Sequence, residues 1–177
     1  DAGTYLIVLP PDYQFLQVLI GEGEQNISLK TDYNAMAEKM VVKNSKDNQL
    51  FYEYLQFLSS QRPEADRLRK AMKEGDEDQQ TKLTKELTQI DERVKNYQQN
   101  LIDQNPETLS AAFIKANMSV DMPEFEGTPE EKQLKQWYYL KDHYFDNIDL
   151  ADNRMSRTPF LYEKVKYYLD KLIVQHP

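Results

Sequence analysis

The chain has 177 residues, which is the length of one domain or of one domain with a small addition. It carries 22 Lys and Arg against 30 Asp and Glu, a net charge of −8 that repels phosphate backbones, so we expect no nucleic-acid partner. The sequence contains no cysteine, which excludes disulfides and thiol chemistry from these residues. No apolar run approaches the roughly 20 residues that cross a bilayer, and we expect no transmembrane segment.

The first 43 residues have the pattern of short β-strands. Their strand-like runs are rich in β-branched and aromatic side chains or alternate with period two. The runs cover residues 5–9, 13–20, 27–31 and 40–42. Pro10-Pro11-Asp12 is a turn between the first two runs. Because three or four strands form an incomplete sheet, we interpret residues 1–43 as the end of a truncated β domain, or as a sheet that packs on the helices behind it.

From residue 44 onward the apolar residues recur with helical spacing. A first helix begins after Ser45, a favourable N-cap residue, and we expect it to stop before Pro63. A second helix starts near Pro63 and ends at Gly75, where we expect a left-handed C-terminal residue. Asp76 and Gln79 have the spacing of a cap for a further helix. The sequence leaves open whether the chain forms a helical hairpin at this point or one continuous helix.

The segment after Asp76 carries the most regular pattern of the chain. Its apolar residues are spaced 4, 3, 4, 3 and 4 residues apart, like the seam of a helix that packs along a partner helix. They are Leu83, Leu87, Ile90, Val94, Tyr97 and Leu101. The other faces of this helix carry Lys, Glu, Gln and Asp, so we interpret the seam as core rather than as a ligand site.

Three shorter helices follow. Asn105-Pro106 restarts the chain before a short helix with an apolar face. Thr128-Pro129-Glu130-Glu131 is a capping box with proline at the first helical position, and the helical spacing after it continues to Ile148. Thr158-Pro159 opens the last helix. The patterns predict a mainly α protein, an irregular bundle of five or six helices over residues 44–177 preceded by a small antiparallel β segment, α+β overall.

The acidic residues in the last third of the chain do not have the spacing of a metal site. Asp146, Asp149 and Asp152 recur every third residue, whereas an EF-type calcium loop uses alternate positions, a glycine and a final glutamate. His143 shares a helix face with Asp146, but the only other histidine is His176, too little for a three-ligand transition-metal site. Phosphate-binding glycine loops and the Gly-x-Ser-x-Gly elbow are also missing. We expect no metal, no cofactor and no catalytic residue in this sequence.

The aromatic cluster over residues 137–145 has two interpretations. Aromatic residues on one helical face usually fill the core, because each removes a large area from water. Trp and Tyr are also favoured anchors in protein and sugar contacts. Tyr139 and His143 are one helical turn apart and lie off the main apolar face, so they are better suited to a binding surface.

Arg154 and Arg157 flank an acidic stretch. Pairing with Asp149 or Asp152 is the simpler interpretation, whereas as hydrogen-bond forks they would fasten the chain to a neighbouring domain. Together with the aromatic cluster, the two arginines complete the set of candidate docking or binding residues. The set is Trp137, Tyr139, His143, Asp146, Arg154 and Arg157.

The residues around these candidates resemble a known family. The signature comprises His143-Tyr144-Phe145-Asp146-Asn147-Ile148-Asp149-Leu150-Ala151-Asp152, Arg154, Arg157-Thr158-Pro159, Leu161, Tyr168-Leu169, Leu172 and Gln175-His176-Pro177. Upstream, the matching residues are Gly3-Thr4-Tyr5-Leu6-Ile7-Val8-Leu9-Pro10, Gly21-Glu22, Asn48 and Leu50-Phe51-Tyr52. On these residues nearly the whole chain is similar to the helical domain of unknown function, with the end of the preceding β domain, in thioredoxin-like, thiol-disulfide-interchange-type envelope proteins of Bacteroidetes. Phe145-Asp146-Asn147 and Arg157-Thr158-Pro159 are the most specific part.

In that family an export signal and a β domain precede the helical module, and a thioredoxin-like domain with a CxxC motif follows it. The resemblance implies that this sequence is the middle piece of such a protein, located in the cell envelope or periplasm, with lipoproteins among its relatives. It also implies an adjacent thioredoxin-like domain as partner. It assigns no redox role to any residue here, because the sequence contains no cysteine.

Three functional hypotheses follow. The leading one is a non-catalytic helical module that positions or docks a C-terminal redox domain and its clients, which include envelope proteins or peptides. The second is a module that binds a peptide or a glycan in an aromatic surface groove. The third is that the chain is part of a thiol-disulfide oxidoreductase whose active site lies beyond residue 177.

Overall fold

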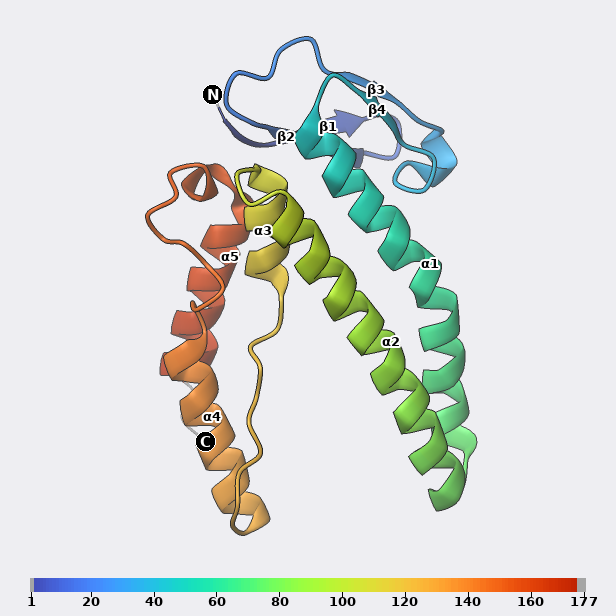
Figure 1. Cartoon of the computed structure of the whole chain (residues 1–177), viewed down its shortest axis with the longest axis vertical. Coiled ribbons are helices and arrows are strands. Elements are labelled where there is room, and N and C mark those ends of the chain that lie inside the picture. Colours follow the sequence, from blue (N-terminus) through green and yellow to red (C-terminus); the bar gives the residue numbers. More distant parts are fainter. Residues whose placement is uncertain (1, 175–177) are drawn as a thin grey trace.

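The protein is described by a computed structural model in which residues 2–174 are placed. Figure 1 shows two helical arms that diverge from a shared end, where the β-strands and a short helix lie. The long hairpin of α1 and α2 forms one arm, and α4 with the C-terminal helix α5 forms the other. The last three residues of the sequence signature, Gln175-His176-Pro177, lie outside the described residues.

The first arm is a helical hairpin. Helix α1 (Lys46–Glu74) begins at the Ser45 cap, and α2 (Glu77–Gln104) begins at Asp76, whose side chain forms a capping box with Gln79. The two caps are confirmed, and of the two alternatives that the sequence left open the chain forms the helical hairpin, not one continuous helix. The predicted left-handed conformation of Gly75 is also wrong, because its φ of −87° and ψ of 154° are extended.

The predicted helix break at Pro63 is wrong, because α1 continues through this residue. The helix packs on the same partner, α2, on both sides of the exposed proline. Before it, Tyr54 packs with Leu101, and after it Leu68 packs with Ile90. Apolar contacts along one partner therefore offset the missing hydrogen bond and the steric cost of an interior proline.

The apolar seam of α2 is core, as predicted. Its first half packs against Ala65 and Leu68 of α1, and its second half packs around Tyr54. Tyr97 also stacks on Phe57, with ring centroids 3.8 Å apart and planes 14° apart. The hairpin is thus held along its length by side chains from one face of each helix.

The other three α-helices are shorter. Helix α3 (Leu109–Asn117) is capped by Thr108, α4 (Pro129–His143) by the capping box at Thr128, and α5 (Pro159–Tyr167) by Thr158. Short 3-10 turns, η1 (Tyr33–Ala35) and η2 (Met155–Arg157), and a π-helical segment, η3 (Tyr168–Ile173), complete the helical structure. Among residues 2–174 there are five α-helices, which confirms the mainly α, α+β prediction. In that same range no helix combines the length and apolarity needed to span a membrane.

Helix α4 ends at His143, five residues before the predicted end at Ile148. Residues 144–147 form turns in which the Asp146 and Ile148 amides donate to the carbonyls of His143 and Phe145. These turns bring Ile148 into the core, where it packs with Met155 and Leu109. The helical spacing therefore continues past the helix because the turn residues are packed as well.

The β segment consists of two separate antiparallel ribbons. β1 (Gly3–Leu9) pairs with β2 (Gln14–Ile20), and β3 (Ser28–Lys30) pairs with β4 (Val41–Lys43). The four predicted runs are confirmed with small shifts at their ends. Because each ribbon has only two strands, both depend on the helices for support. The division into domains at residues 43 and 44 stays a prediction.

A buried asparagine joins β2 to α1. Asn48 has no exposed surface, and its side-chain amide imitates a neighbouring strand. The Leu19 amide donates to Asn48 Oδ1 at 2.9 Å, and Asn48 Nδ2 donates to the Leu19 carbonyl at 2.5 Å. One turn later, the Tyr52 hydroxyl donates to the Gln17 carbonyl at 2.7 Å. Two side chains of α1 therefore satisfy backbone groups on the outer edge of β2.

Asp47, the residue before Asn48, joins α1 to α3. Asp47 Oδ1 accepts from the Ser110 amide at 2.7 Å, and the Ser110 hydroxyl donates to the Asp47 carbonyl at 2.5 Å. Gly21 lies so close that a Cβ at its position would overlap the Asp47 carboxylate. Glu24 accepts from the Gly21 amide and the Ser45 hydroxyl at 3.1 and 3.0 Å. We call these residues, with Asn48, the α1 junction.

Replacing Asn48 by leucine tests the junction. The substitution keeps the branched shape of the side chain but leaves the buried N–H and C=O of Leu19 without partners, which costs about 2–4 kcal/mol of unfolding free energy. Urea denaturation monitored by circular dichroism measures the loss. Asn117, which is exposed and bonds only to the Phe113 carbonyl, provides the control, and Asn117→Leu should change the stability by less than about 0.5 kcal/mol. Equal effects of the two variants would contradict this role for Asn48.

The carboxyl group of Asp47 predicts a pH dependence. Burial raises its pKa above the ordinary value, and the negative charge of Glu24 adds to the rise. The folded state therefore holds the proton more tightly than the unfolded state, and stability is lost as the pH rises through the folded pKa. We expect wild type to lose stability relative to Asp47→Asn as the pH rises above about 4, the ordinary pKa of an aspartate, in urea titrations at several pH values.

Asp152 is the matched control, with the opposite sign. The Arg154 guanidinium, which donates to this carboxylate, lowers its pKa. The folded state therefore releases the proton more easily than the unfolded state, and wild type should gain stability relative to Asp152→Asn as the pH rises from acid. The same slope for both variants would contradict the assignment.

Candidate functional site

The structure places four of the six predicted site residues at two cavities, whereas Trp137 and His143 line neither of them. Tyr139, His143 and Asp146 come together at the end of α4, as the sequence predicts for neighbours one turn apart. Arg157 ends η2 and Arg154 directly precedes it, and both lie beside the loop that follows β2. Trp137 is packed edge-on against Tyr138, with centroids 4.9 Å apart, and carries the Lys141 ammonium 5.4 Å from its ring.

The first cavity, which we call the α4 groove, has a volume of about 390 Å³. Its lining includes the apolar side chains of Ile102 and Val120. The polar lining comes from α2, from the end of α3 and from the turn after α4. It consists of Lys95, Gln99, Asp103, Lys115, Ser119, Asp121, Tyr139, Asp146 and Asn147. The lining therefore combines apolar side chains with hydrogen-bond donors, acceptors and one aromatic ring, which is the composition of a small binding site.

The wall formed by α4 is held in place by its own contacts. The rings of Tyr139 and His143 stack with centroids 4.1 Å apart and planes 29° apart. His143 Nδ1 lies 2.6 Å from Asp146 Oδ2, and Phe125 contacts Tyr139 edge-on at 5.9 Å. Each ring thus has a fixed neighbour, so a ligand would meet a preformed surface.

A second cavity, of about 410 Å³, continues the α4 groove along α2. Lys95 and Asp121 line both cavities and form an ion pair of 2.5 Å across the boundary between them. The lining residues on α2 extend from Asp91 to Asp103, which corresponds to about 18 Å of helix. A groove of this length has room for about five residues of an extended peptide.

At the other site, away from the α4 groove, several hydrogen bonds hold the Arg154 guanidinium. Its Nε and Nη2 donate to the Asp152 carboxylate at 2.9 and 2.7 Å, and its Nη1 donates to the Glu107 carbonyl at 2.8 Å. The hydrogen bond with Asp152 raises the pKa of Arg154, and the charges of Asp152, Asp47 and Glu22 add to the rise. Of the two predicted local partners, Asp152 is confirmed, whereas the Asp149 carboxylate accepts from the Ala151 amide.

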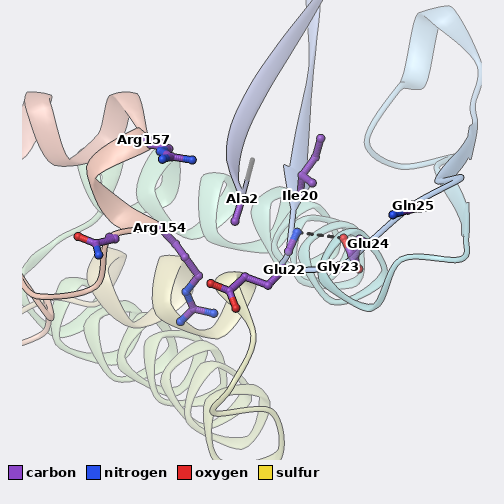
Figure 2. Close-up of a pocket in the computed structure, with 10 residues that line it drawn as sticks. Ala2, Ile20, Glu22, Gly23, Glu24, Gln25, Arg154 and Arg157 are labelled. Carbon is purple, nitrogen blue, oxygen red and sulfur yellow. Dashed lines mark hydrogen bonds between the residues drawn. The ribbon is translucent and has the colours of Figure 1, made fainter.

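Arg154 and Arg157 line a cavity of about 440 Å³, which we call the arginine pocket. In Figure 2 the two arginines and Glu22 lie around the space next to Ala2, with Glu22 extended toward Arg154. Glu24 closes the far side through its bond with the Gly21 amide. Two cationic and two anionic side chains therefore line the pocket, so its charge is balanced rather than suited to a phosphate.

Gly3 allows β1 to lie directly against this pocket. Its φ of 151° is in a region that favours glycine, and a Cβ at this position would lie 3.0 Å from the Arg157 Cβ. A larger residue would push β1 away from η2. The wall of the arginine pocket therefore depends on the absence of a side chain at Gly3.

Several lining residues had not been predicted from the sequence. Asn147, whose Nδ2 donates to the Met118 carbonyl at 3.2 Å, belongs to the most specific part of the signature, which is the signal that would have identified it. Gln99, Asp103 and Lys115 carry no comparable signal, because only the tertiary packing of α2 and α3 brings them to α4. Metal chemistry lacks a basis in residues 2–174, where no group of three or more His, Asp or Glu side chains is placed to hold an ion.

Comparison with known proteins adds no relative. No protein-family model, no curated protein and no solved structure matches the chain. The resemblance to the Bacteroidetes thioredoxin-like proteins therefore stays a prediction, and the functional argument depends on the geometry of the two arms and the two cavities.

Proposed function

We propose that this chain is a non-catalytic helical module that docks and positions a neighbouring domain. The observation that carries the proposal is an apolar surface on α5 and η3. Tyr162, Val165, Leu169 and Ile173 recur at intervals of three and four residues and are all exposed, with Val174 beyond them 75% exposed. Residues at this spacing lie along one side of a helix, so they form a continuous apolar strip. Such strips are typical of protein-interaction surfaces.

The arm behind this strip is stiffened by aromatic contacts. Tyr144 stacks on Tyr167, with centroids 5.8 Å apart and planes 12° apart, and Phe145 contacts Tyr168 at 5.0 Å. The Lys164 ammonium lies 5.0 Å from the centroid of the Tyr144 ring, and burial lowers the pKa of Lys164. The turn after α4 and the helix α5 therefore move as one unit, which supports a docking surface of fixed shape.

The identity of the neighbouring domain follows from the resemblance. A thioredoxin-like domain would follow residue 177, in an exported protein of the cell envelope or periplasm. The intact protein would then reduce or isomerise disulfides through cysteines outside this sequence, because residues 1–177 contain none. The codons after residue 177 of the parent gene test this point directly, since the proposal requires a CxxC after a strand.

Hydrogen exchange of the full-length protein tests the docking surface. We expect amides of residues 159–174 to exchange at least about tenfold more slowly in the full-length protein than in the 177-residue chain, because a docked domain excludes water and opposes local opening. Leu169→Asp should abolish this protection. Leu150→Asp, at another exposed leucine, is the control and should leave it intact. Equal exchange in both lengths of protein would contradict docking on this strip.

The α4 groove favours a second candidate function, the binding of a peptide or a glycan. Its lining combines apolar side chains with amide and carboxylate groups and with the ring of Tyr139, which stacks on His143. These are the groups that bind extended polar ligands. This candidate would use Tyr139, His143 and Asp146, whereas docking of a domain on α5 and η3 would not require them.

Peptide and glycan arrays probed with the 177-residue chain test the second candidate. For a ligand found in this way, Tyr139→Ala and His143→Ala should each weaken binding about tenfold, the typical cost of one anchor residue, without lowering the melting temperature. Tyr162→Ala, at an exposed tyrosine outside the groove, is the control. Parallel losses of affinity and melting temperature would instead assign Tyr139 and His143 to the core.

A further inference from the structure

The ribbon of β1 and β2 has one closed edge and one open edge. On β2, the Leu19 and Gln17 backbone groups point away from β1, because Asn48 and Tyr52 of α1 bond to them. In an antiparallel pair, the residues opposite such groups also point outward. The opposite residues on β1 are Thr4, Leu6 and Val8.

These outward groups of β1 form the open edge. Near Gly3 the strand is covered by η2, but Leu6 and Val8 are 51% and 55% exposed. Within residues 2–174, no backbone or side-chain group bonds to the outward N–H and C=O of these two residues. A strand edge of this kind is a template for another strand.

The open edge also lacks the features that usually prevent pairing. Natural proteins protect edges with lysines, prolines, bulges or short strands. β1 has seven residues, and none is charged or a proline. The side chains beside the edge are apolar on both faces of the ribbon, with Leu6, Val8 and Phe15 on one face and Tyr5 and Ile7 on the other, and all five are exposed.

We propose that β1 pairs with β1 of a second copy of this chain, to give a four-stranded antiparallel sheet across a two-fold axis. Pairing of Leu6 with Val8 of the second copy, and of Val8 with Leu6, satisfies the outward groups of both strands. Four strands also exceed the three that a sheet needs for independent stability. The second copy is favoured by charge, since the chain carries −8 overall but no charged side chain between Ala2 and Pro11.

The same register brings the turn after β1 of each copy close to the start of β1 in the other copy. It places the turn that carries the exposed Asp12 opposite Ala2 of the second copy. Ala2 lines the arginine pocket together with Arg154 and Arg157, as Figure 2 shows. The turn of each copy thus approaches the arginine pocket of the other, where Glu22 and Glu24 balance the two arginines, so the contact neither attracts nor repels strongly.

Sedimentation velocity over the micromolar to millimolar range tests the proposal. Wild type should change from one chain to two with rising concentration. Leu6→Lys should raise the dissociation constant at least about tenfold, because it places a lysine on each side of the symmetric edge. Leu6→Pro should have a similar effect, since it removes the outward N–H and leaves the bonds to β2 intact. Asp12→Asn should change the dissociation constant by less than about threefold, because the arginine pocket that it approaches is balanced in charge.

Leu150→Lys is the control, because this exposed leucine lies outside the ribbon. Circular dichroism and urea transitions confirm that each variant remains folded. The mass of a single chain at every concentration overturns the proposal. A dimer whose dissociation constant is unchanged by both Leu6→Lys and Leu6→Pro also overturns it, because association would then use another surface.

Discussion

The fold depends on the pairing of one side-chain amide with one backbone residue. Leu19 is fully buried at the outer edge of β2, where no strand of residues 2–174 continues the sheet. An unpaired peptide group in such a place is costly, and Asn48 supplies both missing partners in the geometry of a neighbouring strand. The first turn of α1 therefore has to lie beside β2. The direction of the whole hairpin arm follows from this contact.

The adjacent residue extends the constraint to the second arm. Asp47 holds the first turn of α3 through Ser110, and the carbonyl of Glu107, two residues before α3, accepts a hydrogen bond from Arg154, directly before η2. Three elements that are distant in the sequence thus meet around one helical turn. The arginine pocket lies beside this meeting point, and its charged groups are held in place by bonds that also support the fold. Burial of Asp47 as a carboxylate is the energetic cost of this arrangement.

Local signals predicted four helix starts correctly, because a cap is a contact among residues three apart. The start expected at Asn105-Pro106 was wrong, since α3 begins at Leu109 after the Thr108 cap. Ser45, Asp76, Thr128 and Thr158 all cap helices as expected. The errors lie where tertiary packing decides, as at Pro63, where contacts with α2 hold α1 together. The same distinction applies to the α4 groove. Its α4 wall was predictable from neighbours on one helix, whereas the wall from α2 and α3 depends on how the arms meet.

Large exposed apolar side chains are absent from the described hairpin of α1 and α2 and are concentrated in two other regions. No large apolar side chain of α1 or α2 is exposed in the described structure, because the seam between the helices buries them and the outer faces are polar. Most of the exposed ones lie on the ribbon at residues 5–15 and on α5 and η3 at residues 162–174. The others are Val41, Met122, Leu134, Tyr138 and Leu150. Apolar surface in water is unfavourable, so both regions gain most from a partner. The two regions differ in what they can bind, since the ribbon offers unpaired backbone groups to a strand and the C-terminal helix offers only side chains. A strand partner and a packed domain therefore occupy different surfaces, and one chain can hold both at once.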